Sequence, residues 1–185
     1  ASIAKKAKIP VRVGTSHRVY HLVTCTDRLN FTRKNSDMHE SQLNHELLRP
    51  FGLTELPELE EIVDTTQFFQ VPDVKLTTEL SELNKATVLH PKSQGSAKEW
   101  PIKKYMELAL FIANKGEKVV FTGTEAEGEK FRKQIPDHPN IIDTTGTLSL
   151  EQLMALIANS TNLVACSTGP LHIAGYYGVN TIGLY

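Results

Sequence analysis

The stretch that decides the fold is residues 162–177, NLVACSTGPLHIAGYY. Its first part, residues 162–166, is a short apolar run of the kind that forms a buried strand, and residues 170–177 have the composition of a helix. Only three residues separate the two segments. The sequence therefore predicts a strand that turns directly into a helix.

The same alternation extends outward from this stretch through the second half of the chain. The predicted strands are 86–89, 118–121, 140–142, 162–166 and 181–185. The predicted helices are 102–114, 125–134, 170–177 and one that begins after the N-cap Ser149. Strands that alternate strictly with helices form βαβ units around a parallel sheet with helices on both faces. We therefore expect an α/β fold.

Polar segments follow the predicted strands at 86–89, 118–121 and 162–166. Ligands of an open parallel sheet bind beyond the carboxyl ends of the strands, so these segments are candidate ligand loops. In the third, Ser167 or Thr168 is suited to cap a helix, and Gly169 permits a close approach to the backbone. The N–H groups and dipole of such a helix start bind anions. An ordinary capped helix with His172 on its surface is an equally good interpretation.

Two further residues in these segments are candidates for nucleotide contacts. Lys98 ends the loop after the first strand, where its charge can meet a phosphate, although a solvated surface lysine is the commoner case. Glu127 lies near a predicted helix start and can accept hydrogen bonds from ribose hydroxyls. A first-turn glutamate that only stabilises the helix dipole is equally expected there.

Composition and motif searches exclude several classes of protein. The chain has 185 residues, with 20 Lys+Arg and 21 Asp+Glu, so its net charge of -1 gives no reason to expect nucleic acid as a partner. Its apolar runs are too short to span a membrane. Cys25 and Cys166 form no CxxC pair, which suits a reducing cytosol. A GxGxxG fingerprint is absent, Gly123 and Gly128 have P-loop spacing without the following Lys-Ser/Thr, and no metal site is indicated.

The first part of the chain lacks this regular alternation of strands and helices. A strand-like run occupies residues 11–14, a helix-like run covers 38–51, and Gly52 is a plausible helix stop. The acidic, proline-bearing stretch that follows is typical of a connecting segment. Because the chain begins with Ala1 and ends on an apolar strand, we expect a fragment cut at both ends.

Taken together, several motifs in a fixed order resemble glycosyltransferase family 9, the family of the ADP-heptose:lipopolysaccharide heptosyltransferases. They are His90-Pro91, Lys98-Glu99-Trp100-Pro101, Gly123, Leu148-Ser149-Leu150 and Ser167-Thr168-Gly169-Pro170-Leu171-His172-Ile173-Ala174. The match is closest over residues 86–185. Residues 1–55, with the segment IPVRVG at 9–14, resemble the end of the family's N-terminal domain.

The resemblance implies a GT-B architecture, in which two Rossmann-like domains face a cleft. Residues 1–60 would be the remnant of the acceptor-side domain, 61–85 a linker, and 86–185 the nucleotide-sugar domain, truncated at its C-terminus. The implied reaction is inverting transfer of a sugar, with heptose one option, from a nucleotide-diphosphate donor to a lipopolysaccharide or other lipid-linked cell-surface glycan. An ADP-sugar is favoured as the donor, and no cofactor or metal is implied. The place of action would be the cytoplasmic side of the membrane, with peripheral contact through the missing domain.

The resemblance also implies roles for residues. Lys98 would contact the diphosphate or sugar and stabilise the leaving group, Glu127 would hold the ribose, and Leu148 would lie near the adenine. Thr168, Gly169 and His172 would meet the phosphates. Further donors would come from Ser93, Gln94 and Ser96. The general base would lie outside this chain, which is therefore expected to be inactive alone.

One departure from the family pattern keeps other functions open. Many heptosyltransferases have Asp where this chain has Ser167, a position expected to contact the sugar, so the sugar is not fixed by the sequence. A nucleotide-sugar epimerase of the same fold is an alternative, but it needs carboxylates near the sugar and Ser167 supplies none. A non-catalytic nucleotide-sugar-binding module is another. A phosphate-binding receiver-like domain would need clustered Asp residues at the first strand end, where His90-Pro91 stands.

Overall fold

The computed structural model divides the chain into two compact units, unit 1 (residues 1–68) and unit 2 (residues 69–185). It describes residues 1–34, 36–65, 70–74, 81–93, 95 and 97–184. The boundary falls inside the segment 61–85 that was expected to connect two domains. Within the described ranges, no helix is both long and apolar enough to cross a membrane.

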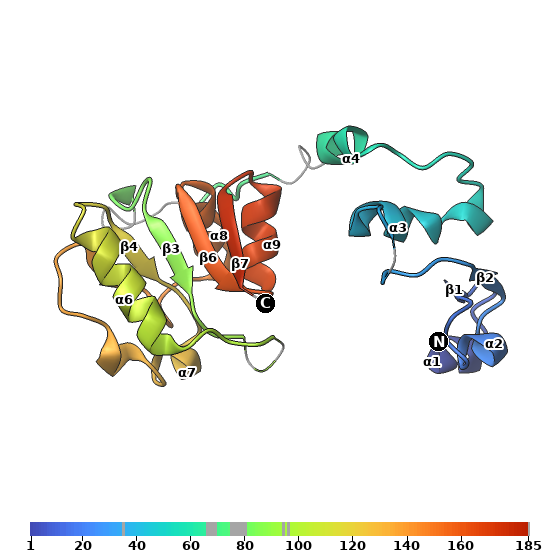
Figure 1. The fold of residues 1–185 in the computed structure, drawn as a ribbon, viewed down its shortest axis with the longest axis horizontal. Coiled ribbons are helices and arrows are strands. Elements are labelled where there is room, and N and C mark those ends of the chain that lie inside the picture. Colours follow the sequence, from blue (N-terminus) through green and yellow to red (C-terminus); the bar gives the residue numbers. More distant parts are fainter. Residues whose placement is uncertain (35, 66–69, 75–80, 94, 96, 185) are drawn as a thin grey trace. The chain divides into compact units, whose positions relative to one another are not determined.

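Unit 2 is built on a sheet of five parallel strands (Figure 1). They are β3 (Thr87–His90), β4 (Val119–Phe121), β5 (Ile141–Asp143), β6 (Asn162–Cys166) and β7 (Asn180–Leu184). Their order across the sheet is β5-β4-β3-β6-β7, so the first strand lies in the middle. The chain adds β4 and β5 on one side of β3 and then crosses over to add β6 and β7 on the other. The α/β fold with a parallel sheet expected from the sequence is confirmed.

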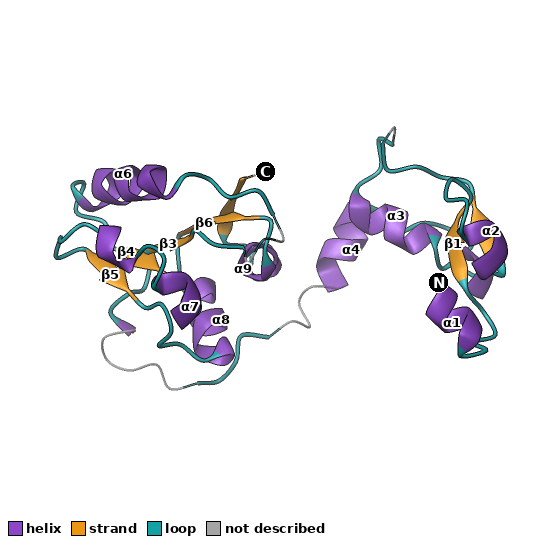
Figure 2. Cartoon of the chain, turned by 90° about the horizontal axis from the view of Figure 1, so that it is seen from below, coloured by secondary structure: helices purple, strands orange, loops and turns teal. Residues whose placement is uncertain are grey.

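Helices cover both faces of this sheet (Figure 2). Helix α6 (Ile102–Ala113) packs on the face that carries Leu89 and Phe121. Helices α8 (Leu150–Ala158) and α9 (Gly169–Tyr176) pack on the opposite face, with Val88 and Val120. Adjacent strand residues thus enter different cores, and β3, β4 and most of β6 are buried on both faces. Continuous apolar runs, rather than alternating ones, are what such doubly covered strands require.

Local signals in the sequence set several of these boundaries. Ser149 begins α8 through a capping box, because its hydroxyl accepts from the N–H of Gln152 (3.2 Å) and the Gln152 side chain accepts from the N–H of Ser149 (2.9 Å). Gly178 follows the end of α9 with a φ of 68°, a conformation that favours glycine. The predicted cap at Ser149 is therefore confirmed.

The single helix predicted over residues 125–134 is wrong. The structure has a short helix α7 (Glu125–Gly128) and a separate 3₁₀ turn at Arg132–Gln134. Between them the chain turns inward, and the ring of Phe131 is 1% exposed with its centroid 5.9 Å from that of Phe121. Burial of an aromatic side chain outweighs the small helix preference of the residues around it.

Unit 1 holds a two-stranded parallel sheet of β1 (Val13–Thr15) and β2 (Asp27–Leu29) with short helices. The helices are α1 (Ser2–Lys6), α2 (His21–Thr24), α3 (Glu40–Glu46) and α4 (Leu59–Thr65). The helix-like run predicted over 38–51 is two pieces, α3 and a 3₁₀ turn at Arg49–Phe51, because Pro50 has no N–H to continue an α-helix. Gly52 ends this turn with a φ of 97°, as the predicted helix stop requires. Most of α4 lies in the expected linker.

Candidate functional site

In the sheet of unit 2, the chain runs outward from β3 in one direction through β4 and β5, and in the other direction through β6 and β7, so the loops after β3 and β6 lead to opposite sides. This topological switch point lies between β3 and β6, which pair in parallel with His90 opposite Ala165. In open α/β sheets the crevice beyond the carboxyl ends of such strands is where ligands bind. The candidate site therefore follows from the strand order, which the sequence did not show.

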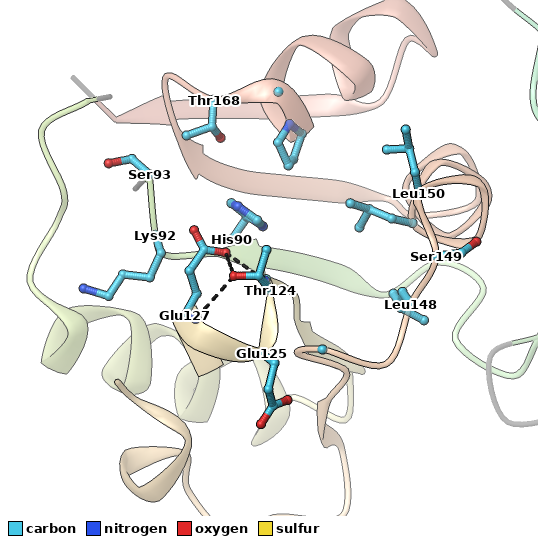
Figure 3. Close-up of a pocket in the computed structure, with 15 residues that line it drawn as sticks. His90, Lys92, Ser93, Thr124, Glu125, Glu127, Leu148, Ser149, Leu150 and Thr168 are labelled. Carbon is cyan, nitrogen blue, oxygen red and sulfur yellow. Dashed lines mark hydrogen bonds between the residues drawn. The ribbon is translucent and has the colours of Figure 1, made fainter. Parts of the chain in front are cut away.

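A cavity of about 710 Å³ opens at this point (Figure 3). Its size is typical of small-molecule sites, which are roughly 300–1,000 Å³. It is lined by residues that follow β3, β4, β5 and β6. They are His90, Lys92, Ser93, Gly123, Thr124, Glu125, Glu127, Gly146, Leu148, Ser149, Leu150, Leu153, Thr168, Gly169 and Pro170.

His90 forms the floor of the cavity at the end of β3. Its side chain is buried, and its Nδ1 lies 3.0 Å from the hydroxyl of Thr122. Burial lowers the pKa of His90 below its usual value, and the negative charge of Glu127 opposes that shift. The imidazole is consequently neutral near pH 7, and it offers a hydrogen-bonding group to a ligand rather than a charge.

Glu127 lies in the wall that follows β4. Its Oε2 accepts hydrogen bonds from the N–H (2.8 Å) and the hydroxyl (3.0 Å) of Thr124, while the Thr124 hydroxyl accepts from the Glu127 N–H (3.3 Å). This capping box fixes the carboxylate of Glu127, a residue that is 4% exposed, at the cavity surface (Figure 3). The structural role that the sequence allowed for Glu127 is thus present. Its predicted contact with a ribose stays a prediction.

The start of helix α9 forms the wall that follows β6. Thr168 is its N-cap, but the Thr168 hydroxyl donates to the carbonyl oxygen of Cys166 (3.2 Å) and makes no capping hydrogen bond. The expectation of a side-chain cap from Ser167 or Thr168 is therefore wrong. Gly169 lines the cavity, and a Cβ atom on it would have no neighbour within 4 Å. The helix start thus faces open space, where an anion can reach its N–H groups.

The loop after β3 is organised by a carboxylate. Glu99 accepts from Lys92 Nζ (2.7 Å) and, through its other oxygen, from the N–H (2.9 Å) and hydroxyl (3.2 Å) of Ser93. Partial burial raises the pKa of Glu99, but the contacts with Lys92 and Ser93 outweigh burial and hold that pKa below its usual value. Lys92 and Ser93 line the cavity, whereas Lys98 is exposed and is not among the lining residues.

An apolar wall completes the cavity. Leu148 precedes α8, and Leu150 and Leu153 lie in its first turn. Leu150 is 62% exposed and so presents apolar surface at the cavity. Such a surface is suited to stack against a flat apolar group such as a nucleobase.

The structure brings together five of the ten residues predicted to bind the donor, namely Ser93, Glu127, Leu148, Thr168 and Gly169. Ser167 and His172 are not among the lining residues, and His172 is exposed. Gln94 and Ser96 lie outside the described residues. The sequence reasoning missed His90, Lys92 and Thr124 as lining residues, although each follows a predicted strand within two or three positions.

A smaller hollow of about 370 Å³ lies in unit 1. Its lining residues are Thr15, His17, Arg18, Phe31, Thr32, Arg33 and Lys34. Arg33 is held by Glu40 (2.6 Å) and Asn44 (3.0 Å). Three cationic side chains and two hydroxyls favour an anionic group there, a feature that the sequence reasoning did not identify. In the described part of the chain, no cluster of three or more His, Cys, Asp or Glu side chains is placed to hold a metal ion.

Comparison with known proteins gives consistent matches. The family described as "Glycosyltransferase family 9 (heptosyltransferase)" matches residues 1–185. Lipooligosaccharide heptosyltransferase 2 of Haemophilus influenzae is 26% identical over an alignment of 172 residues, and the match covers 85% of this chain and 50% of that protein. This chain thus spans half the length of that relative.

Two solved structures share the fold. A family 9 glycosyltransferase from Veillonella parvula superposes with a TM-score of 0.64 at 22% identity, covering 100% of this chain and 53% of the other. Escherichia coli heptosyltransferase WaaC, solved with ADP-2-deoxy-2-fluoro heptose, gives a TM-score of 0.67 at 16% identity. The superposition covers 95% of this chain and 54% of the WaaC chain. These likenesses confirm the expected α/β fold of GT-B type.

Proposed function

This chain belongs to glycosyltransferase family 9, and we propose that the whole protein transfers a sugar from a nucleotide-diphosphate donor to a cell-surface glycan. In this proposal, residues 69–185 bind the donor. The observation that carries it is the cavity at the switch point between β3 and β6, which combines an apolar wall, a buried carboxylate and an open helix start. These are the three surfaces that a nucleobase, a ribose and a diphosphate need.

The donor is placed by matching its parts to these surfaces. The nucleobase lies against Leu148 and Leu150, and the ribose hydroxyls donate to Glu127. The diphosphate meets the N–H groups at Thr168 and Gly169. We favour ADP as the nucleotide because the family resemblance implies it, and the WaaC structures that share the fold hold ADP or an ADP-heptose analogue. In this proposal the nucleotide sugar is the substrate, and no cofactor or metal is required.

The proposed chemistry is direct displacement at the anomeric carbon with inversion. An acceptor hydroxyl attacks, the bond to the nucleoside diphosphate breaks, and a general base receives the hydroxyl proton. The protein must stabilise negative charge that develops on the leaving diphosphate. We assign that role to the α9 start and to Lys98, which an incoming diphosphate draws toward the cavity from its exposed position. The general base is assigned to no residue of this chain.

The acceptor is proposed to be an acidic glycan carried on a lipid. The cationic hollow of unit 1, with Arg18, Arg33 and Lys34, supports an acceptor that carries phosphate or carboxylate groups. The proposed place of action is the cytoplasmic face of the membrane. The chain itself is proposed to bind donor without completing transfer.

The test is calorimetric titration of this chain with ADP, UDP and GDP, using Lys98→Ala and Lys103→Ala variants. Lys103 is an exposed lysine near the start of α6 and serves as the matched control. We expect ADP to bind most tightly, and Lys98→Ala to weaken it about tenfold, the loss expected for one charge-assisted hydrogen bond. Equal losses in the two variants would contradict the role of Lys98. Failure of all three nucleotides to bind the folded chain would contradict the donor site.

A further inference from the structure

An arginine outside the cavity joins two of the loops that form its wall. Arg132 donates from Nε to Asp143 Oδ2 (2.9 Å) and from its two terminal nitrogens to the two oxygens of Glu125 (2.7 and 2.8 Å). Its Nη2 also donates to the hydroxyl (2.9 Å) and the carbonyl oxygen (3.1 Å) of Thr145. One rigid, planar guanidinium thus ties α7 to the turn after β5.

The network is better suited to fixing positions than to adding stability. The side chains of Arg132, Glu125 and Asp143 are 39%, 59% and 21% exposed, and ion pairs at such positions contribute little to the free energy of folding. Its geometry is nevertheless well specified, because each of the three guanidinium nitrogens donates to at least one acceptor. The hydroxyl of Thr145, which is almost fully buried, also donates to Asp143 (2.7 Å) and locks the turn.

The two loops approach so closely that only glycine fits at two positions. A Cβ atom on Gly128 would lie 2.2 Å from the Thr145 hydroxyl and 2.8 Å from Arg132 Nη2. A Cβ atom on Gly146 would lie 2.2 Å from Glu125 Oε2 and 3.0 Å from the Glu125 Cα. The glycine at 128, which gave the sequence its P-loop-like spacing, therefore serves the packing of α7 on the turn after β5.

Both joined loops carry groups that line the cavity. Glu127 lies in α7, two residues after Glu125, and Gly146 and Leu148 follow Thr145. Arg132 itself is not a lining residue. Any change in how α7 packs on the turn after β5 changes the position of the Glu127 carboxylate relative to the apolar wall at Leu148.

We propose that Arg132 is a positioning residue, which sets the Glu127 carboxylate at the right distance from the apolar wall to receive the ribose of a nucleotide. The inference rests on the proposed function for the identity of the ligand. Arg132 acts through Glu125 and Thr145 and makes no contact with the ligand. Its loss affects how well the site recognises ribose hydroxyls, and leaves the phosphate contacts at α9 in place.

The experiment compares ADP with 2′,3′-dideoxy-ADP by calorimetry, since only ADP offers ribose hydroxyls to Glu127. In the unaltered chain we expect about tenfold preference for ADP, the worth of a hydrogen bond to a charged group. Arg132→Gln is expected to remove most of this preference. Arg132→Lys should keep a part of it, because lysine retains the positive charge but lacks the planar guanidinium that donates to several acceptors at once. Arg49→Gln is the matched control, since Arg49 forms a two-point pair with Glu46 (2.7 and 3.1 Å) in unit 1.

A double variant separates positioning from a general loss of structure. If Arg132 serves to position the Glu127 carboxylate, adding Arg132→Gln to a Glu127→Gln variant causes no further loss of the preference for ADP over 2′,3′-dideoxy-ADP. Equal weakening of both ligands, with the ADP preference intact, would show a merely structural role and overturn the proposal. So would an unchanged preference in Arg132→Gln. An unaltered, folded chain that binds neither ligand would overturn the proposed function, and this proposal with it.

Discussion

The two units of the chain differ most in what they bury. Unit 2 encloses two apolar clusters, one on each face of its sheet, and its central strands are fully covered. In the described part of unit 1, Leu43 is the one hydrophobic residue that is buried, while Val19 and Val23 are 81% and 67% exposed. Unit 2 therefore has a core that can hold a binding site in fixed geometry.

Charge is distributed unevenly within unit 1, although its nine Lys+Arg balance its nine Asp+Glu. Residues 1–34 contain eight lysines and arginines and one acidic residue, Asp27, although the whole chain is nearly neutral. Ion pairs occur in both units: Arg132 pairs with Glu125 and Lys92 with Glu99 beside the cavity of unit 2, and Arg33 pairs with Glu40 in unit 1. The paired charges of unit 2 position groups at the cavity, and the basic first half of unit 1 favours an anionic partner.

The largest effect on stability is expected from a substitution that leaves an empty space in the core of unit 2. Leu163 is fully buried in β6 between β3 and β7, so Leu163→Ala should lower the free energy of unfolding by about 2–5 kcal/mol. Denaturant unfolding followed by fluorescence of Trp100, which packs against the core of unit 2, measures this change. Leu43→Ala in unit 1 should leave that transition unmoved. A shared loss would show that the two units do not unfold independently.

A smaller but more local effect is expected at the packed glycine of α7. Gly128→Ala places a methyl group against Thr145 and should cost about 1–3 kcal/mol, with weaker ADP binding. The matched control is Gly175→Ala in α9, where a Cβ atom has no neighbour within 4 Å. That change should stabilise the helix by roughly 0.5–1 kcal/mol. Thermal unfolding with and without ADP distinguishes the two, and a neutral Gly128→Ala would refute the close packing.

The smallest effect is a pH dependence from His90. Because burial depresses the pKa of His90 below 6.5, the unfolded chain binds this proton more readily than the folded one. The contribution of neutral His90 to the free energy of unfolding is therefore fully present above about pH 6.5. It is lost as the pH falls toward the pKa of the folded state, with a slope of at most about 1.4 kcal/mol per pH unit. His90→Gln should flatten the slope of stability against pH in this window. His172→Gln, at an exposed position, is the control for the loss of a histidine.

Local patterns were enough to predict much of unit 2. All five strands were expected within one or two residues, because each contains a short apolar segment between turn or helix signals, and the N-cap Ser149 predicted the start of α8. Within the same unit the helix over 125–134 failed, because burial of Phe131 is a tertiary effect that no local pattern shows.

The site was predicted less completely than the fold. Glu127, Thr168 and Gly169, predicted from their positions after strands, line the cavity, and their contacts with a ligand stay predictions; His90 and Lys92 also line it but were not assigned to the site. The reason is that strand order decides which loops meet, and order is set by packing across the sheet rather than by residues next to each other in the chain. Lys98 was chosen for its charge and position in the motif, whereas the structure shows Lys92 at the cavity.

The central claim is that unit 2 binds a nucleotide at its switch point. It is tested most directly by titrating ADP into the isotopically labelled chain and recording amide chemical shifts. We expect the largest shifts in the loops after β3, β4, β5 and β6, including residues 90–93, 123–127, 146–150 and 168–170. We expect small shifts in residues 13–34. Shifts concentrated in unit 1, or at the edges of the sheet away from β3 and β6, would contradict the claim.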